Sequence, residues 1–186
     1  MERAEKIGAG ETARQIAQSL SEARGSLLVF RGRFTEALPH CRHAAAGPFE
    51  RAYEVLGFAI AAALARDDMA LEEATQMAGR LQRHTTMAVV SREFTAAVDA
   101  ARRGDYEQTE AHAAFVLEQL GGWEQLVLGA CVRAALSANA RGSVRERYLA
   151  EVEDSIEASG LLGLKPMLAE VEAARAGLSS VGSPSG

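Results

Sequence analysis

The residue types most able to do chemistry stand together in one short segment that contains Glu36, His40, Cys41 and His43. Glu36, His40 and His43 follow one another at i, i+4 and i+7, so on a helix their side chains share one face. Imidazole, carboxylate and thiolate groups are zinc ligands, which makes a metal site geometrically conceivable. A complete site needs further ligands, and His112 lies 72 residues after His40, as a repeated position would. We therefore expect a structural or surface role for this segment and no bound metal.

Sequence patterns typical of a catalytic site are as weak as the pattern of metal ligands. A serine or cysteine nucleophile needs a base within hydrogen-bond reach, and no motif places one. Gly8-Ala9-Gly10 could approach a phosphate, but no strand pattern precedes it and no Gly-Lys-Ser/Thr follows it. Dense carboxylates such as Glu72-Glu73, Glu151 and Glu153 are typical of solvated helix faces. We expect neither an enzyme nor a cofactor, and a helical-bundle enzyme is the least favoured function.

Composition predicts one all-α domain. Of the 186 residues 48% are hydrophobic but only 5% are aromatic, and the abundant alanine favours closely spaced helices. A net charge of -5 with scattered cations argues against direct binding of nucleic acid. Apolar runs stay below about 18 residues, which argues against a membrane span. The two cysteines, Cys41 and Cys131, fit reduced buried thiols, so we expect a cytoplasmic protein.

Two similar helix hinges organise the chain. In the segment 101–106, Arg102 and Arg103 suit the end of a helix, Gly104 suits a left-handed cap, and Asp105 suits the start of the next helix. The segment 31–34 repeats the arginine, the glycine and the following aromatic residue 72 residues earlier. At the same offset, six of ten residues are identical between 55–64 and 127–136.

Helical periodicity and these breaks predict helices at about 11–31, 34–46, 49–66, 69–83, 86–103, 105–120, 123–140, 143–159 and 166–178. Residues 1–10 are expected to form a flexible lead-in to the domain at 11–178, and residues 179–186 a disordered tail.

The glycine-to-glycine distances resemble those of the tetratricopeptide repeat over residues 18–158. The matching residues are Gly25, Leu28, Gly32, Phe34, Ala37, Ala44 and Pro48, then Tyr53, Leu56, Gly57 and Ile60, then Gly104 and Tyr106, then Leu128, Gly129 and Val132. The chain departs from the family pattern at Thr109, where a packing alanine is expected, and at Glu93, where a large apolar residue is expected. The segment 162–168 also resembles the last helix of C-terminal repeat arrays in bacterial signal-transduction and transcriptional regulators. These resemblances imply a right-handed stack of about four helical hairpins with a C-terminal capping helix.

In tetratricopeptide arrays the first helix of each hairpin lines a concave groove. Counted from Gly57, the corresponding positions in the first unit are Arg51, Glu54, Phe58 and Ala61. Counted from Gly129, those in the second unit are Trp123, Leu126, Ala130 and Arg133. Arg133 interrupts an apolar helix and needs a partner, either an acid on a neighbouring helix or a carboxylate of a bound partner. Gly57 and Gly129 lie inside apolar helices, so we expect both to mark close helix contacts.

We expect a non-catalytic interaction protein that binds a peptide or a partner helix in this groove. It could be a stand-alone adaptor or the sensor region of a larger regulator. The alternative is a regulatory domain that binds a small-molecule effector in the same concavity. The sequence leaves the partner and the oligomeric state open.

Overall fold

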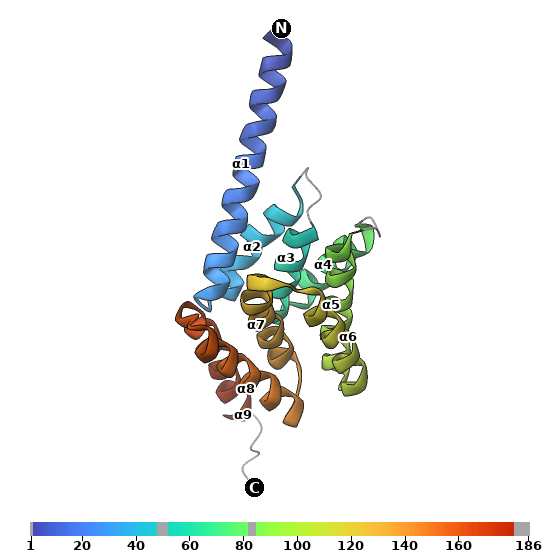
Figure 1. Cartoon of the computed structure of the whole chain (residues 1–186), viewed down its shortest axis with the longest axis vertical. Coiled ribbons are helices and arrows are strands. Elements are labelled where there is room, and N and C mark those ends of the chain that lie inside the picture. The colour runs from blue at the N-terminus through green and yellow to red at the C-terminus, as the bar shows by residue number, and fades with distance from the viewer. Residues whose placement is uncertain (1, 48–51, 82–84, 181–186) are drawn as a thin grey trace.

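The computed structural model describes residues 2–47, 52–81 and 85–180, and these residues form an all-α fold (Figure 1). The all-α prediction is confirmed over these ranges. The elements are α1 (Glu2–Phe30), α2 (Phe34–Ala45), α3 (Ala52–Ala65), α4 (Asp68–Arg80), α5 (Thr86–Arg103), α6 (Tyr106–Gln119), α7 (Gly122–Asn139), α8 (Gly142–Ser159), the 3-10 turn η1 (Leu162–Leu164) and α9 (Lys165–Ser180).

The core forms around α3 and α7. Residues 58–64 of α3 and 134–139 of α7 are buried without a break, because these helices are covered on several sides. Each helix from α1 to α6 packs against the next one along the chain, as do α7 and α8, and α7 packs against both α3 and α5. The unbroken apolar run at 55–65 is typical of a helix in such a central position.

Local chemistry sets the helix ends as the sequence indicated. Gly104 takes a left-handed conformation with φ of +76°, and the side chain of Asp105 accepts a hydrogen bond from the Gln108 amide at the start of α6. Asp67 and Thr85 cap α4 and α5 in the same way, through the amides three residues on. Such caps satisfy backbone groups that a helix end leaves without an intrahelical partner.

The two interior glycines differ. A Cβ at Gly57 would meet no atom within 4 Å, so the predicted close contact at Gly57 is wrong. A Cβ at Gly129 would lie 3.1 Å from Nη1 of Arg133 on the same helix and 3.6 Å from Leu117 Cδ2 on α6, which is an ordinary van der Waals distance. The close helix contact at Gly129 stays a prediction. The difference follows from position, because Gly57 is half-buried and Gly129 is buried.

The ends of the chain are more helical than the sequence suggested. The first helix was expected from residue 11, and α1 already includes residues 2–10. At the other end α9 continues to Ser180, while residues 181–186 lie outside the described residues. In Figure 1 the N-terminal half of α1 extends beyond the body that the other helices form. The division into a lead-in, a domain at 11–178 and a tail stays a prediction.

Candidate functional site

The predicted groove residues lie in different environments. Glu54 and Phe58 are buried, and so are Ala61 and Ala130. The Arg42 guanidinium of α2 lies over the Phe58 ring, 5.6 Å from its centroid. Leu126 is exposed near the start of α7. Arg51 and the side chain of Trp123 lie outside the described residues. The described members of this set do not meet on one open surface, and their role in binding stays a prediction.

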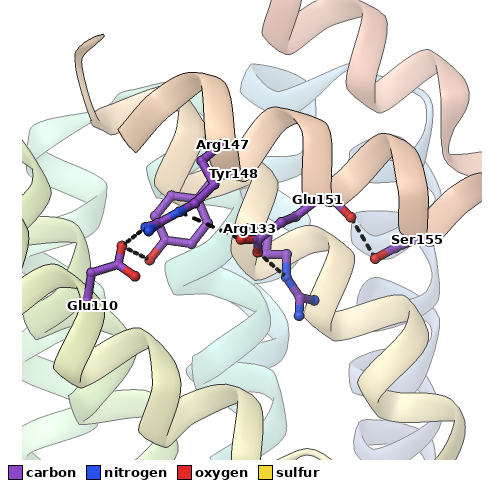
Figure 2. Close-up of polar contacts among 6 residues, drawn as sticks. All are labelled: Glu110, Arg133, Arg147, Tyr148, Glu151 and Ser155. Atoms are coloured by element: carbon purple, nitrogen blue, oxygen red, sulfur yellow. Dashed lines mark hydrogen bonds and ion pairs between the residues drawn. The ribbon is translucent and has the colours of Figure 1, made fainter. Parts of the chain in front are cut away.

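Arg133 forms an ion pair within the chain. Its Nε lies 3.0 Å from Oε2 of Glu151 on α8, which is the first of the two alternatives for this residue. Figure 2 shows how Glu151 connects onward to Arg147, which also pairs with Glu110 on α6. Tyr148 donates a hydrogen bond to Glu110 over 2.8 Å, and burial, together with this carboxylate, raises the pKa of its phenol. The network ties α8 to both α6 and α7.

The segment around Cys41 has the properties of a structural segment. Glu36 forms an ion pair with Arg33, whose guanidinium lowers the pKa of that carboxyl. Cys41 is buried against α1, and burial raises the pKa of its thiol to about 12. A thiol with such a pKa stays protonated at neutral pH and is a poor metal ligand. Among the described residues, no three His, Cys, Asp or Glu side chains are placed to hold a metal ion.

A cavity of about 630 Å³ lies where the C-terminal ends of α3, α5 and α7 meet the N-terminal ends of α4 and α8. We call it the arginine cavity. Its lining residues are Arg66, Asp68, Arg102, Ala138, Asn139, Ala140, Arg141, Gly142, Arg145 and Glu146. Four arginines and two acids give this lining a surplus of two positive charges, in a chain whose net charge is -5.

One wall of the cavity is fixed by polar contacts. Arg102 Nη1 lies 2.7 Å from Asp68 Oδ1, and Arg102 Nε donates to Asn139 Oδ1 over 2.7 Å. The Nδ2 group of Asn139 donates to the carbonyl oxygens of Ala63, at 2.8 Å, and Ala135, at 2.7 Å. These contacts join α3, α4, α5 and α7, so the position of Arg102 is defined by four helices.

Arg66 has the least usual backbone of the lining residues. It takes a left-handed conformation with φ of +54°, and no other non-glycine residue does so in the described part of the chain. Gly32, Gly104 and Gly160 hold this conformation just beyond the ends of α1, α5 and α8. A β-carbon makes it costlier by about 1–2 kcal/mol. Over the same described ranges, the side chains of Arg66 and Arg141 have no hydrogen bond or ion pair.

Two further hollows adjoin the arginine cavity. One, of about 620 Å³, shares Asp68 and Arg102 with it and continues between α4 and α5. The other, of about 190 Å³, shares Arg66 and Arg145 with it and continues toward α2 and α9. The arginine cavity therefore occupies the middle of a row of three hollows.

Sequence reasoning missed this site because its arginines come from three separate segments, at Arg66, at Arg102 and at 141–145. One signal was present: Arg66 and Arg102 are 36 residues apart, half of the 72-residue repeat, and they lie at the C-terminal ends of α3 and α5. The scattered cations gave no basic run that would draw attention to them.

No family model, curated protein or solved structure matches the chain. None of the helices in the described ranges combines the length and the apolar character that crossing a membrane requires.

Proposed function

We propose that the chain is a non-catalytic binding module built from four helical hairpins and a capping helix. The packing of α1 on α2, α3 on α4, α5 on α6 and α7 on α8 supports the four hairpins. The contacts of α9 with α7, α8 and α1 support its role as the cap. Such a module would serve as an adaptor or as the sensor region of a regulator, as the resemblance to tetratricopeptide arrays implies.

The binding site in this proposal is the arginine cavity, and the ligand is an acidic segment of a partner protein. The observation that carries the proposal is Arg66, an arginine in a conformation that glycine holds at comparable helix ends. A residue kept in a disfavoured backbone conformation points to a role for its side chain. Because Arg66 lines a cavity with three other arginines, that role is to bind an anion.

The chemistry of the lining suits binding better than proton transfer. A guanidinium keeps its charge at every accessible pH and offers planar donors that fit a carboxylate or a phosphate in a two-point contact. The start of α8 adds a second favourable feature, because its N-cap residue Arg141 provides no side-chain cap. Amides in the first turn of a helix favour a nearby negative charge.

A small anionic molecule is the second candidate ligand, and the size of the cavity favours it. Pockets for small molecules have volumes of about 300–1,000 Å³, and the arginine cavity at about 630 Å³ falls within this range. The adjoining hollow between α4 and α5 gives an extended peptide further room, which favours the protein segment.

The test compares binding by wild type and by variants at Arg66. Fluorescence anisotropy would follow labelled peptides rich in Asp and Glu, with the matching Asn and Gln peptides as the uncharged reference. Citrate and inorganic phosphate would compete as small anions. Loss of one charge-assisted contact corresponds to about 1.5–3 kcal/mol, so Arg66→Gln should weaken binding by roughly 10- to 100-fold.

Arg80→Gln is the matched control, because Arg80 is an exposed arginine on α4 outside the cavity lining and its loss changes the net charge equally. It should leave the affinity unchanged. Arg66→Gly should also weaken binding while the melting temperature holds or rises, since glycine suits the left-handed conformation. Equal losses at Arg66 and Arg80, or full affinity in Arg66→Gly, would contradict the proposal.

A further inference from the structure

The long helix α1 carries an apolar surface that nothing in the described structure covers. We call it the α1 stripe; it consists of Ala13, Ile16, Leu20, Ala23 and Leu27, all of them exposed. Ile16 is 56% exposed, Leu20 62% and Leu27 48%, values that are unusual for large aliphatic side chains. We propose that the α1 stripe is a self-association surface that pairs with the same stripe of a second copy of this chain.

The spacing of the stripe is that of a coiled-coil seam. Its residues follow one another by 3, 4, 3 and 4 positions, which is the a and d pattern of a heptad repeat. A seam of this kind packs best against another helix with the same spacing, and an identical copy provides one. A symmetric pair of copies also uses the same patch on both subunits, as most homodimers do.

The opposite face of α1 is already occupied. Gln18 is buried and donates from Nε2 to the Ala44 carbonyl over 2.8 Å. At Gly25 a Cβ would approach Cys41 Sγ to 2.5 Å, so α1 lies close against α2 there. Gln18 and Gly25 lie about 180° around the helix from the stripe residues Leu20 and Ile16. The stripe thus points away from the fold and cannot be covered by rearrangement of α2.

The N-terminal part of α1 has little support from the fold. All residues from 10 to 17 are exposed, and Figure 1 shows this part extending beyond the body. A helical segment shorter than about 12–15 residues is marginally stable in water when it packs on nothing. A second helix along the α1 stripe would supply packing contacts at residues that make none within their own chain.

The residues beside the stripe allow two copies to approach. Ala17 and Arg24 flank it on one side, and Ser19 and Ser26 on the other. In a parallel pair, residues at g face residues at e of the partner five positions on, so Ser19 would lie opposite Arg24. The seam and its flanks therefore place no like charges against each other, and the small side chains leave room for the second helix.

The available area limits the strength of the pairing. The α1 stripe spans 15 residues of helix, about 22 Å, and a contact strip about 10 Å wide then covers roughly 220 Å² on each copy. Stable interfaces bury about 800 Å² per partner. We therefore expect a weak dimer that dissociates on dilution, not a permanent one.

Sedimentation equilibrium of the full chain from about 5 to 500 μM tests this inference. Wild type should shift from monomer to dimer within this range, and Leu20→Glu should weaken the association at least 10-fold by placing a charge in the seam. Gln15→Glu is the control, because Gln15 is exposed on α1 outside the stripe and the substitution adds the same charge. Its association should match that of wild type.

Circular dichroism would establish that both variants keep the fold. A wild-type chain that stays monomeric at every concentration would overturn the inference and assign the stripe to a different partner. Equal weakening by Leu20→Glu and Gln15→Glu would also overturn it, because charge alone would then explain the effect. The measurement uses no anionic ligand, so its outcome is independent of the proposal for the arginine cavity.

Discussion

Replacing Asn139 by alanine should destabilise the fold by about 3 kcal/mol. Asn139 is a buried amide near the end of α7, and the three hydrogen bonds of its side chain are short: 2.8 Å to the Ala63 carbonyl, 2.7 Å to the Ala135 carbonyl, and 2.7 Å from Arg102 Nε. The contact with Ala63 joins α7 to α3, and the contact with Arg102 joins α7 to α5. Alanine removes all three and leaves nothing polar in their place.

The magnitude follows from the kind of each bond. A neutral hydrogen bond contributes about 0.5–1.5 kcal/mol and one to a charged group about 1.5–3 kcal/mol. The hydrogen bond to the Ala135 carbonyl lies within α7 and contributes least to the free energy of unfolding. The Ala63 carbonyl keeps a hydrogen bond from the Arg66 amide, and Arg102 keeps its ion pair with Asp68, which moderates the loss. About 3 kcal/mol is the resulting expectation.

Thermal unfolding followed by circular dichroism measures this change. For a chain of this length 1 kcal/mol shifts the melting temperature by about 2–4 °C, so Asn139→Ala should lower it by roughly 6–12 °C. Ser137→Ala is the matched control, because Ser137 is buried on the same helix and makes a single 3.3 Å hydrogen bond to the Arg145 carbonyl. It should cost less than about 1 kcal/mol. Equal shifts for the two variants would refute the reasoning.

Two further predictions concern the half-buried ion pair of α7 and the interior glycines. Arg133→Ala should cost about 1 kcal/mol, and a double-mutant cycle with Glu151→Ala should show coupling between the two side chains, which lie 3.0 Å apart. A stable Arg133→Ala variant that loses binding of acidic peptides would instead favour a role for Arg133 in capturing a partner. Gly57→Ala should stabilise the fold by about 0.5–1 kcal/mol in urea denaturation, because a helical alanine is favoured and the Cβ has room. Gly129→Ala should gain less, since its Cβ would lie 3.1 Å from Arg133 Nη1, and an equal gain at both positions would contradict this reading.

The parts of the fold that local chemistry decides could be predicted from the sequence. The hinge at Gly104 and Asp105 was placed correctly, because a left-handed glycine and a capping carboxylate leave a pattern in adjacent residues. The end of α8 at Gly160 follows the same rule. The start of α1 was not predicted, because residues 2–10 have charged side chains and two glycines, and their pattern shows no continuous apolar face.

The groove could not be derived in the same way, because it depends on which distant helices meet. Alanine on α3 and α7 indicated close packing, but not that α7 would contact α3 as well as α5. Glu54 and Phe58 are buried, although an open tetratricopeptide groove would expose these positions. The apolar residues of α1 illustrate the same limit: Ile16 and Leu20 recur at helical spacing, but this periodicity does not say whether the surface that covers them comes from this chain.

Arg66 shows how a departure from a local rule can indicate a site. At comparable helix ends the chain uses glycine, and glycine would favour the turn after α3 as well. An arginine there gives up about 1–2 kcal/mol of backbone preference, and its side chain has no partner within the described chain to offset this. One charge-assisted contact with a ligand would offset it, at about 1.5–3 kcal/mol. The proposal thus requires stability and affinity to change in opposite directions in Arg66→Gly, a result that a purely structural role for this arginine would not produce.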